Sequence, residues 1–424
     1  MEFKIGILIF IVTFYLIVSE KVPGSLATLG GGLLMVLSGI INEKEGLEAV
    51  ASRLEIIFLL IGMMIIVHVI SETGIFQWFA IKVAQLVKGE PFKLIILLVI
   101  VTAVCSAFLD NVTTILLIAP VSILLANQLK IRPFPFLMAE IMAANIGGSA
   151  SLIGDPTQLI IGNAGKLGFN DFIFNTAPIS IISLLALIGT IYVMYRKELV
   201  VSRDLKAKIM DLDPSRTLKN KQLLKQALIV FSMVIIGFIL NNFIDKGLAI
   251  ISLSGATVLL LISKKSPAEV FKHVEWDTLF FFIGLFILIE GVEKIKLIDM
   301  IGNHIVVLTQ GHAKLASLSI LWISSFFTSA IGNVASAATF SKIIDFMIPY
   351  FGEINPRVFW WALSFGTCLG GNFTILASAT NVVAVTAGEK AGIKITFIEF
   401  FKFGAIITLQ TLIIASIYIV VRYF

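Results

Sequence analysis

The stretch Ser106-Ala107-Phe108-Leu109-Asp110-Asn111-Val112-Thr113-Thr114 interrupts a long apolar run, and Thr328-Ser329-Ala330-Ile331-Gly332-Asn333-Val334-Ala335-Ser336 interrupts another run 222 positions later. The two stretches share hydroxyl side chains and one asparagine at matching places. An unpaired backbone group is costly in hydrocarbon, so irregular backbone at membrane depth survives only where protein or a water-filled cavity satisfies it. The matching interruptions therefore predict a membrane protein that is built from two repeats.

A second polar interruption follows each of these stretches at nearly the same offset. Residues 147–157 contain three glycines and an Asp-Pro pair, and residues 370–380 contain two glycines and several hydroxyl side chains. Helices that are broken in mid-membrane commonly form the substrate site of transporters with internal repeats. We therefore expect the site to lie between the two repeats.

The composition places the chain in the lipid bilayer. Of its 424 residues, 58% are hydrophobic and 14% are charged, and the mean hydropathy is +1.00. This leaves too little polar surface for a soluble globule. The first apolar run, residues 3–19, has no convincing cleavage site and is expected to remain as a helix. Lys and Arg on cytoplasmic loops explain the net charge of +5, so nucleic-acid binding is not indicated.

The fold class that we predict is an all-α polytopic membrane protein with two inverted repeats. Each repeat has five crossings, one re-entrant helical hairpin and one broken helix. The first repeat spans residues 1–195 and the second spans residues 226–424. Between them, residues 196–225 form a basic linker with nine Lys or Arg and four Asp or Glu, which the positive-inside rule places in the cytoplasm. Both termini then lie outside.

A crossing needs roughly 20 helical residues, and this length guides the expected spans. Each polar tip is flanked by two arms that are short for a crossing, which favours a re-entrant hairpin over two tilted crossings. In the first repeat the expected segments are 3–19, 25–41, 54–71, an interfacial helix 75–87, hairpin arms 94–109 and 115–126, a broken helix 134–146 with 156–164, and 172–195. In the second repeat they are 226–243, 247–263, 276–291, an amphipathic 297–308, arms 315–331 and 335–350, a broken helix 358–388, and 403–421.

The four breaks supply the candidate binding residues. Helix ends at a break expose unpaired N–H groups and carbonyls, which suit anions and cations respectively. Hydroxyl and amide oxygens nearby suit an alkali cation, and oriented amides suit an oxyanion. The candidates in the first half are Ser106, Asn111, Thr113, Thr114, Asn145, Ser149, Ser151 and Thr157. Those in the second half are Thr328, Asn333, Ser336, Asn372, Thr374, Ser378, Thr380 and Asn381.

Carboxylates occur at these breaks in the first repeat only. Asp110 corresponds to Gly332, and Asp155 corresponds to Ser378. An acid within the membrane is expensive and usually marks an ion path or a proton relay, so we expect Asp110 and Asp155 to bind the coupling ion, H+ or Na+. The structural alternative is that both aspartates cap the helices that follow them.

These motifs carry a family resemblance that covers almost the whole chain. The stretch 106–114 with Pro120, and Asn145-Ile146-Gly147-Gly148 followed by Ile153-Gly154-Asp155-Pro156-Thr157, resemble the ion transporter superfamily. Within it the chain is most similar to the branch of arsenite permeases and NhaD-type sodium/proton antiporters, which includes citrate-transporter-like and pink-eyed-dilution-type permeases. The resemblance implies inverted repeats and secondary transport by alternating access, with a homodimer as one assembly.

The first function that we expect is efflux of arsenite or antimonite, a small inorganic oxyacid, in exchange for H+ across the cytoplasmic membrane. The alternatives are a Na+/H+ antiporter and a Na+-coupled carrier of carboxylate or inorganic anions. Cys105 and Cys368 lie near the breaks, where a thiophilic substrate could reach them, although apolar packing is their simpler interpretation. No enzymatic or cofactor motif is apparent, and an energising ATPase would be a separate chain.

Overall fold

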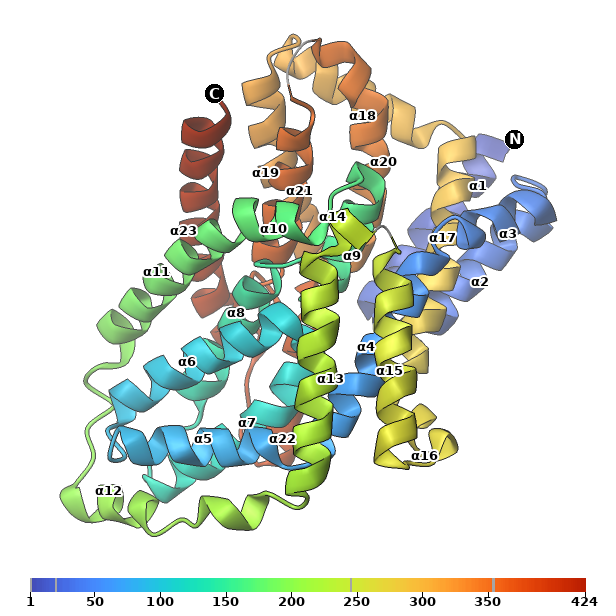
Figure 1. Ribbon diagram of the computed structural model, residues 1–424. Helices are drawn as coiled ribbons and strands as arrows, with labels where there is room; N and C mark the ends of the chain where they lie inside the picture. The colour runs from blue at the N-terminus through green and yellow to red at the C-terminus, as the bar shows by residue number, and fades with distance from the viewer. Residues whose placement is uncertain (1, 20, 245, 353–354) are drawn as a thin grey trace.

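The computed structural model describes residues 2–19, 21–244, 246–352 and 355–424, and the regular elements in these ranges are all helices. Both termini lie at one end of the molecule, and the linker helix α12 (Arg203–Met210) lies at the opposite end (Figure 1). Within these described ranges, eight helices are long and apolar enough to cross a membrane. The chain is therefore an all-α polytopic membrane protein, as the sequence predicts.

The first half contains the hairpin and the broken helix that the sequence indicates. The helix α6 begins with a proline at its first turn, where the missing N–H costs nothing. The elements are α1 (Glu2–Ser19), α2 (Gly24–Leu37), α3 (Glu43–Ala51), α4 (Leu54–Glu72), α5 (Ile75–Leu86), α6 (Pro91–Phe108), α7 (Asn111–Gln128), α8 (Phe134–Gly148), α9 (Pro156–Gly165), α10 (Phe169–Asn175) and α11 (Ala177–Tyr195).

The second half repeats this order after the linker, which holds α12 and the short helix η1 (Pro214–Thr217). Its elements are α13 (Lys221–Ile239), α14 (Asn241–Ile244), α15 (Leu248–Ser263), α16 (Pro267–Phe271), α17 (Trp276–Lys294), α18 (Leu297–Thr309), α19 (Ala313–Ile331), α20 (Asn333–Met347), η2 (Ile348–Phe351), α21 (Arg357–Gly370), η3 (Ile375–Ala377), α22 (Ala379–Lys390) and α23 (Phe397–Tyr423).

Three of the four hairpin arms are longer than the sequence predicts. The helices α6, α7 and α19 have 18, 18 and 19 residues, and each is long and apolar enough to cross a membrane, whereas α20 has 15 residues. In α7 the polar tip residues after Asp110 form the first turn instead of a loop, because the aspartate caps that helix. The expectation of short arms is therefore wrong for these three helices, and the re-entrant hairpin stays a prediction.

Two segments that were expected to be irregular contain helices. Glu43–Ala51, which lie between the expected spans 25–41 and 54–71, form α3, which begins with a capping box between Asn42 and Glu45. The linker is also ordered along α5: Gln85 Nε2 donates to the carbonyl of Leu212 at 2.7 Å, and Lys206 pairs with Glu90 at 2.6 Å. The linker thus packs against the first half and is not a free tether.

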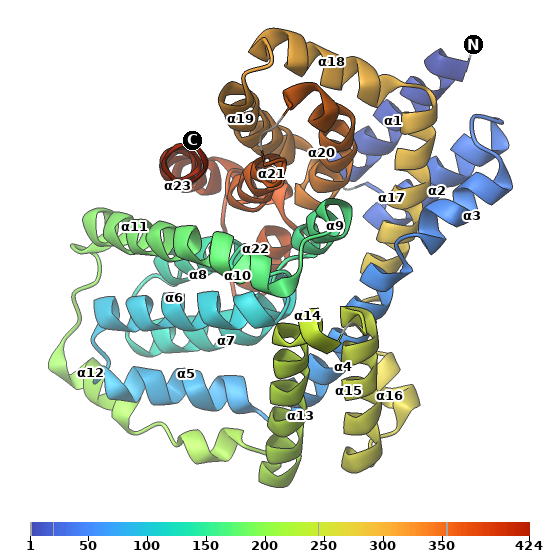
Figure 2. The ribbon, with the colours of Figure 1, turned by 45° about the horizontal axis from the view of Figure 1, so that its top comes forward.

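The two halves pack through matched glycines. The helix α4 packs against α15, and α2 packs against α17, as both views of the ribbon show (Figures 1 and 2). A Cβ atom added to Gly62 of α4 would lie 2.7 Å from the backbone carbon of Ser252, and one added to Gly284 of α17 would lie 2.3 Å from the backbone nitrogen of Leu29. Gly62 and Gly284 are 222 positions apart, so the same close approach occurs once in each half.

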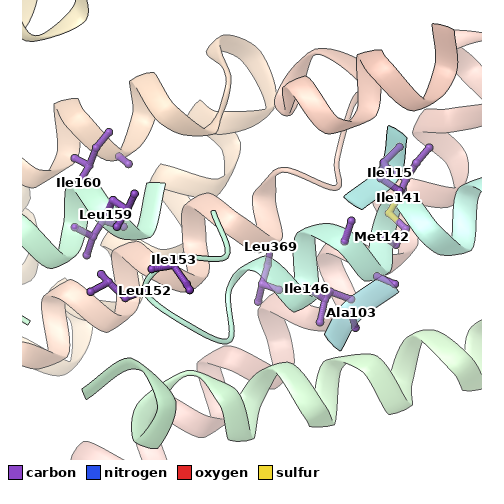
Figure 3. Close-up of a cluster of buried hydrophobic side chains, with 14 of the residues drawn as sticks. Ala103, Ile115, Ile141, Met142, Ile146, Leu152, Ile153, Leu159, Ile160 and Leu369 are labelled. Atoms are coloured by element: carbon purple, nitrogen blue, oxygen red, sulfur yellow. The ribbon is translucent and has the colours of Figure 1, made fainter. Parts of the chain in front are cut away.

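The first broken helix is held in a dense apolar core. Ile146 and Met142 on α8, and Leu159 and Ile160 on α9, point among buried neighbours that include Leu369 of the second half (Figure 3). Leu152 and Ile153 fill the loop between the two helices with apolar side chains. This packing fixes the break without a continuous helix.

Candidate functional site

The tip of each hairpin packs against the broken helix of its own half. Ser106 Oγ donates to the carbonyl of Ala144 at 2.7 Å, and Ser151 Oγ donates to the carbonyl of Ala107. In the second half Thr374 Oγ1 donates to the carbonyl of Ser329 at 2.8 Å. These bonds satisfy carbonyl groups near the irregular backbone, as an apolar environment requires.

Asp155 lies where the two halves meet and is fully buried. Its Oδ2 accepts from Asn111 Nδ2 at 2.7 Å and from Asn333 Nδ2 at 3.1 Å, so it joins the tips of both hairpins. Its Oδ1 accepts from the backbone N–H and the hydroxyl of Thr157 at 2.8 and 2.7 Å. Asp155 therefore caps α9, as the structural alternative holds, and also connects the two repeats.

A set of asparagines continues this network across the interface. Asn145 Nδ2 donates to Asn372 Oδ1 at 2.8 Å and to Asn381 Oδ1 at 2.9 Å, and its own Oδ1 accepts from Asn111 Nδ2 at 3.4 Å and from Ser378 Oγ at 3.3 Å. The network thus links both tips with both broken helices. The sequence analysis named all of these residues, although it did not predict which would touch.

Asp110 has a local partner set. Its Oδ1 accepts from the N–H of Val112 at 2.8 Å, and both carboxylate oxygens accept from the N–H of Thr113 at 3.2 Å. The carboxylate is therefore an N-cap that complements the positive end of α7. The backbone carbonyl of Asp110 also accepts a hydrogen bond from the hydroxyl of Thr114 at 2.9 Å.

The corresponding helix starts in the second half have no side-chain cap. The helix α20 follows Gly332, whose φ of +89° suits a residue without a Cβ, and α22 follows Ser378, which makes no cap hydrogen bond. Thr380, the counterpart of Thr157, is fully buried, and its hydroxyl has no hydrogen-bond partner among the described residues. At the start of α20 the N–H of Val334 donates to Asn333 Oδ1 at 2.9 Å, and the other first-turn N–H groups of α20 and α22 receive no side-chain cap.

A cavity of about 410 Å³ opens beside the network and separates α4 and α17 from the tips. Among the described residues that line it, the charged side chains are Asp110, Glu275 and Asp277, and all three are acidic. Burial, together with the nearby Asp110 carboxylate, raises the pKa of Glu275 to about 7. Ser25 donates a hydrogen bond to Asp277 at the same wall.

Sequence reasoning missed Glu275 and Asp277 because they stand at the very start of the apolar segment 276–291 that is predicted as a span. The available signal was a Glu-x-Asp pair on either side of the first residue of α17, at the end that the neighbouring basic loop places in the cytoplasm. The expected site residues that line the cavity are Asp110, Asn111, Asn333, Ser378 and Thr380.

The remaining expected residues lie behind the cavity or pack the breaks. Ser149 Oγ bonds to the carbonyl of Ile146 and to Ser180 Oγ, and Ser336 Oγ donates to the carbonyl of Ser324 at 3.2 Å. Thr328 is buried, and its hydroxyl has no partner among the described residues. The residues in this group are Ser106, Thr113, Thr114, Asn145, Ser149, Ser151, Asp155, Thr157, Thr328, Ser336, Asn372, Thr374 and Asn381.

The two cysteines take no part in the cavity wall. Cys368 is fully buried, and its Sγ lies 3.0 Å from Thr157 Oγ1 and 2.9 Å from Gln158 Nε2. Cys105 is partly buried on α6. Neither lines the cavity, so thiol coordination of a substrate there has no support in the geometry.

The sequence matches the family model that is described as "Citrate transporter" over residues 14–366. It is 36% identical over 422 residues to the "46 kDa membrane protein" of Mycobacterium leprae, with 99% of this chain and 98% of the relative covered. The "P protein" of Homo sapiens is 31% identical over 471 residues, with 92% of this chain covered, and the match spans 56% of that longer protein.

Solved structures share the fold at low sequence identity. The Neisseria gonorrhoeae protein MtrF, described as illuminating a class of antimetabolite efflux pumps, has a TM-score of 0.66 and 14% identity, covering 94% of this chain and 86% of MtrF. The Alcanivorax borkumensis YdaH transporter has a TM-score of 0.58 and 14% identity, covering 88% and 86%. These similarities establish the fold alone.

Proposed function

Because this chain belongs to the citrate transporter family and is a multi-pass secondary transporter, we propose that it exports the oxyacid of trivalent arsenic or antimony in exchange for H+. The membrane would be the cytoplasmic membrane. The cavity of about 410 Å³ is the substrate site in this proposal, and the network around Asp155 couples substrate movement to the movement of the proton.

The charge of the cavity wall is the observation that carries this proposal. The charged lining residues among those described are carboxylates, which repel a free anion at the mouth of the cavity. The trivalent arsenic oxyacid is uncharged in neutral water, so it meets no such repulsion. Its hydroxyl groups can donate to the carboxylates, and its oxygens can accept from Thr380 and from the open starts of α20 and α22.

Asp155 is suited to the coupling step because its acceptor sites are already filled. Two carboxylate oxygens offer about four lone-pair sites, and four donors within 3.1 Å occupy them. A proton on Asp155 must therefore displace a donor. Displacing Asn111 or Asn333 frees a hairpin tip, so protonation and tip movement become one event. We assign the coupling role to Asp155 and the role of a cap within the cavity wall to Asp110.

The same acidic wall favours Na+/H+ antiport as the second candidate. Carboxylate, hydroxyl and amide oxygens are suitable ligands for an alkali cation, and Asp155 would then exchange Na+ for H+. A carboxylate substrate, as the family description suggests, would need an accompanying cation to enter this cavity.

Flux in proteoliposomes tests the proposal. Purified protein is reconstituted with a pH dye inside, and arsenite or Na+ is added on one side. The proposal expects arsenite movement to dissipate an imposed proton gradient and the gradient to drive arsenite accumulation. Collapse of the proton gradient by Na+ alone, with no response to arsenite, would establish the antiporter instead. Citrate uptake without arsenite flux would replace both with an anion carrier.

A further inference from the structure

A second, smaller cavity of about 100 Å³ shares four lining helices with the first. These are α4, α17, α9 and α20, and the larger cavity is lined by further helices as well. The larger cavity lies toward the linker end of α4, because the backbone N–H of Lys219 donates to the carbonyl of Thr73 just after that helix. The smaller cavity therefore lies toward the opposite face of the membrane.

The barrier between the two cavities is thin. On each of the four helices, the neighbouring lining residues of the two cavities are three or four positions apart, which is about one helical turn or roughly 6 Å. These pairs are Leu60 and Ile56 on α4, Phe282 and Phe286 on α17, Pro156 and Ile160 on α9, and Ala335 and Ala338 on α20. The rings of the two phenylalanines are 5.7 Å apart, so the barrier is apolar.

The lining residues of the two cavities correspond through the internal repeat. Shifting by the same 222 positions relates Arg53 of the smaller cavity to Glu275 of the larger one, and Ile56 to Thr278. In a protein with two inverted halves, counterpart positions face opposite sides of the membrane. The smaller cavity is thus the counterpart of the larger cavity on the opposite side of the membrane. Of the two, the smaller cavity is the closed one.

The smaller cavity contains polar groups that are not fully bonded. Ser341 on α20 is 3% exposed, and its hydroxyl has no hydrogen-bond partner among the described residues. Arg53 donates through Nη1 to the carbonyl of Ala49 at 2.8 Å and belongs to none of the ion pairs in the described part of the chain. Lys342 also lines the cavity and pairs with Glu293 of α17 at 2.5 Å.

We propose that the smaller cavity is the outer end of the transport path and a second binding station, where Ser341 and Arg53 contact an oxygen-rich solute. The volume is enough for a solute with about three oxygen atoms, since one water occupies roughly 30 Å³ of liquid. Asp345 is the acidic lining residue, and it faces Arg53 and Lys342. The identity of the solute rests on the proposed function, whereas the path itself does not.

Thiol labelling tests the path without any substrate. The chain has two cysteines, so Cys105→Ala with Cys368→Ala gives a cysteine-free background, into which Ser341→Cys is introduced. A membrane-impermeant maleimide added to the outer face of oriented vesicles is expected to label this variant. The matched control is Ser325→Cys, because Ser325 is buried, has no partner for its hydroxyl, and lines neither cavity. It is expected to remain unlabelled.

Labelling of Ser341→Cys only from the cytoplasmic face, or from neither face in a variant that still transports, would overturn the path. Arsenite flux then tests the binding station. Ser341→Ala is expected to raise the half-saturating arsenite concentration at the outer face at least threefold and to change it less than twofold at the inner face, with Ser325→Ala unchanged. An equal effect on both faces would refute the station. Absence of arsenite flux in the unmodified protein would refute the proposed function and leave the labelling result valid.

Discussion

The two halves of the molecule agree in their scaffold and differ at the helix ends that face the site. In the first half, α7 and α9 are preceded by Asp110 and Asp155, and each aspartate caps its helix. In the second half, α20 and α22 are preceded by Gly332 and Ser378, and neither helix has a side-chain cap. The scaffold contacts at the matched glycines, by contrast, occur in both halves.

This difference indicates a division of labour between the repeats. The scaffold helices have to pack in the same way in both halves, so the repeat is retained there. At the helix ends, the first half carries the carboxylates of Asp110 and Asp155, which the proposed function assigns to the cavity wall and the coupling ion, and the second half presents helix starts without a side-chain cap and the hydroxyl of Thr380. Variants that exchange these properties between the halves test this interpretation.

Removing the charge of Asp155 should have the largest effect. In Asp155→Asn the side-chain amide has to meet the donating amides of Asn111 and Asn333, and the charge-assisted hydrogen bonds are lost. A loss of roughly 2.7 kcal/mol corresponds to about a 100-fold decrease in net flux. Net flux in proteoliposomes measures this decrease. Thermal unfolding in detergent is the folding control. Net flux within threefold of the unmodified protein would remove Asp155 from the coupling step.

The scaffold glycines should give the next effect, and it should occur in both halves. Gly284→Ala and Gly62→Ala each push a Cβ into the backbone of the facing helix, and the approach is closer at Gly284. We expect destabilisation of about 2 to 3 kcal/mol, larger for Gly284→Ala, from the thermal midpoint in detergent. Gly189→Ala is the control, because an added Cβ there has no atom within 4 Å. Destabilisation by only one of these two substitutions would show that the two halves do not share the same close helix packing.

Placing an aspartate before α22, at the position that corresponds to Asp155, should weaken substrate binding. In Ser378→Asp the new carboxylate can accept from the hydroxyl of Thr380, as Asp155 does from Thr157, and it closes the open start of α22. We expect the half-saturating arsenite concentration to rise about tenfold, which is roughly 1.4 kcal/mol. Ser378→Asn separates capping from charge, since asparagine also caps well. Tighter arsenite binding in Ser378→Asp would contradict the assigned roles.

The smallest effect should come from Asp110. Asparagine is nearly as good an N-cap as aspartate, so Asp110→Asn should change the unfolding free energy by less than about 0.5 kcal/mol. We also expect net flux to stay within about threefold of the unmodified protein, because the proposed coupling step uses Asp155. If Asp110→Asn loses as much flux as Asp155→Asn, the two aspartates act together.

Much of the fold was accessible from the sequence because polar breaks in apolar runs have few physical explanations. The starts of α9 and α20 at Pro156 and Asn333 agree closely with the predicted breaks. The predicted arm that forms α7 is too short because the capping action of Asp110 turns polar tip residues into a first helical turn. The helix α3 is hard to predict because it is short and polar and lies between two apolar segments.

The candidate site was predictable in its residue types and not in its contacts. Asn111, Asn145 and Asp155 were named from the breaks, yet their mutual hydrogen bonds depend on how four helix ends converge in space. Glu275 escaped notice because a carboxylate next to a cytoplasmic loop is ordinarily solvated. Only the fold, which places the start of α17 across the cavity from the hairpin tips, brings it into the cavity wall.

The protonation of Asp155 is the central claim, and infrared difference spectroscopy tests it most directly. Reconstituted protein is recorded with and without arsenite, and the carboxylic acid carbonyl region is compared between the unmodified protein and Asp155→Asn. The account predicts a carbonyl band that changes on arsenite binding and is absent in Asp155→Asn. No carboxylic acid band on arsenite binding, or a band that persists unchanged in Asp155→Asn, would contradict it.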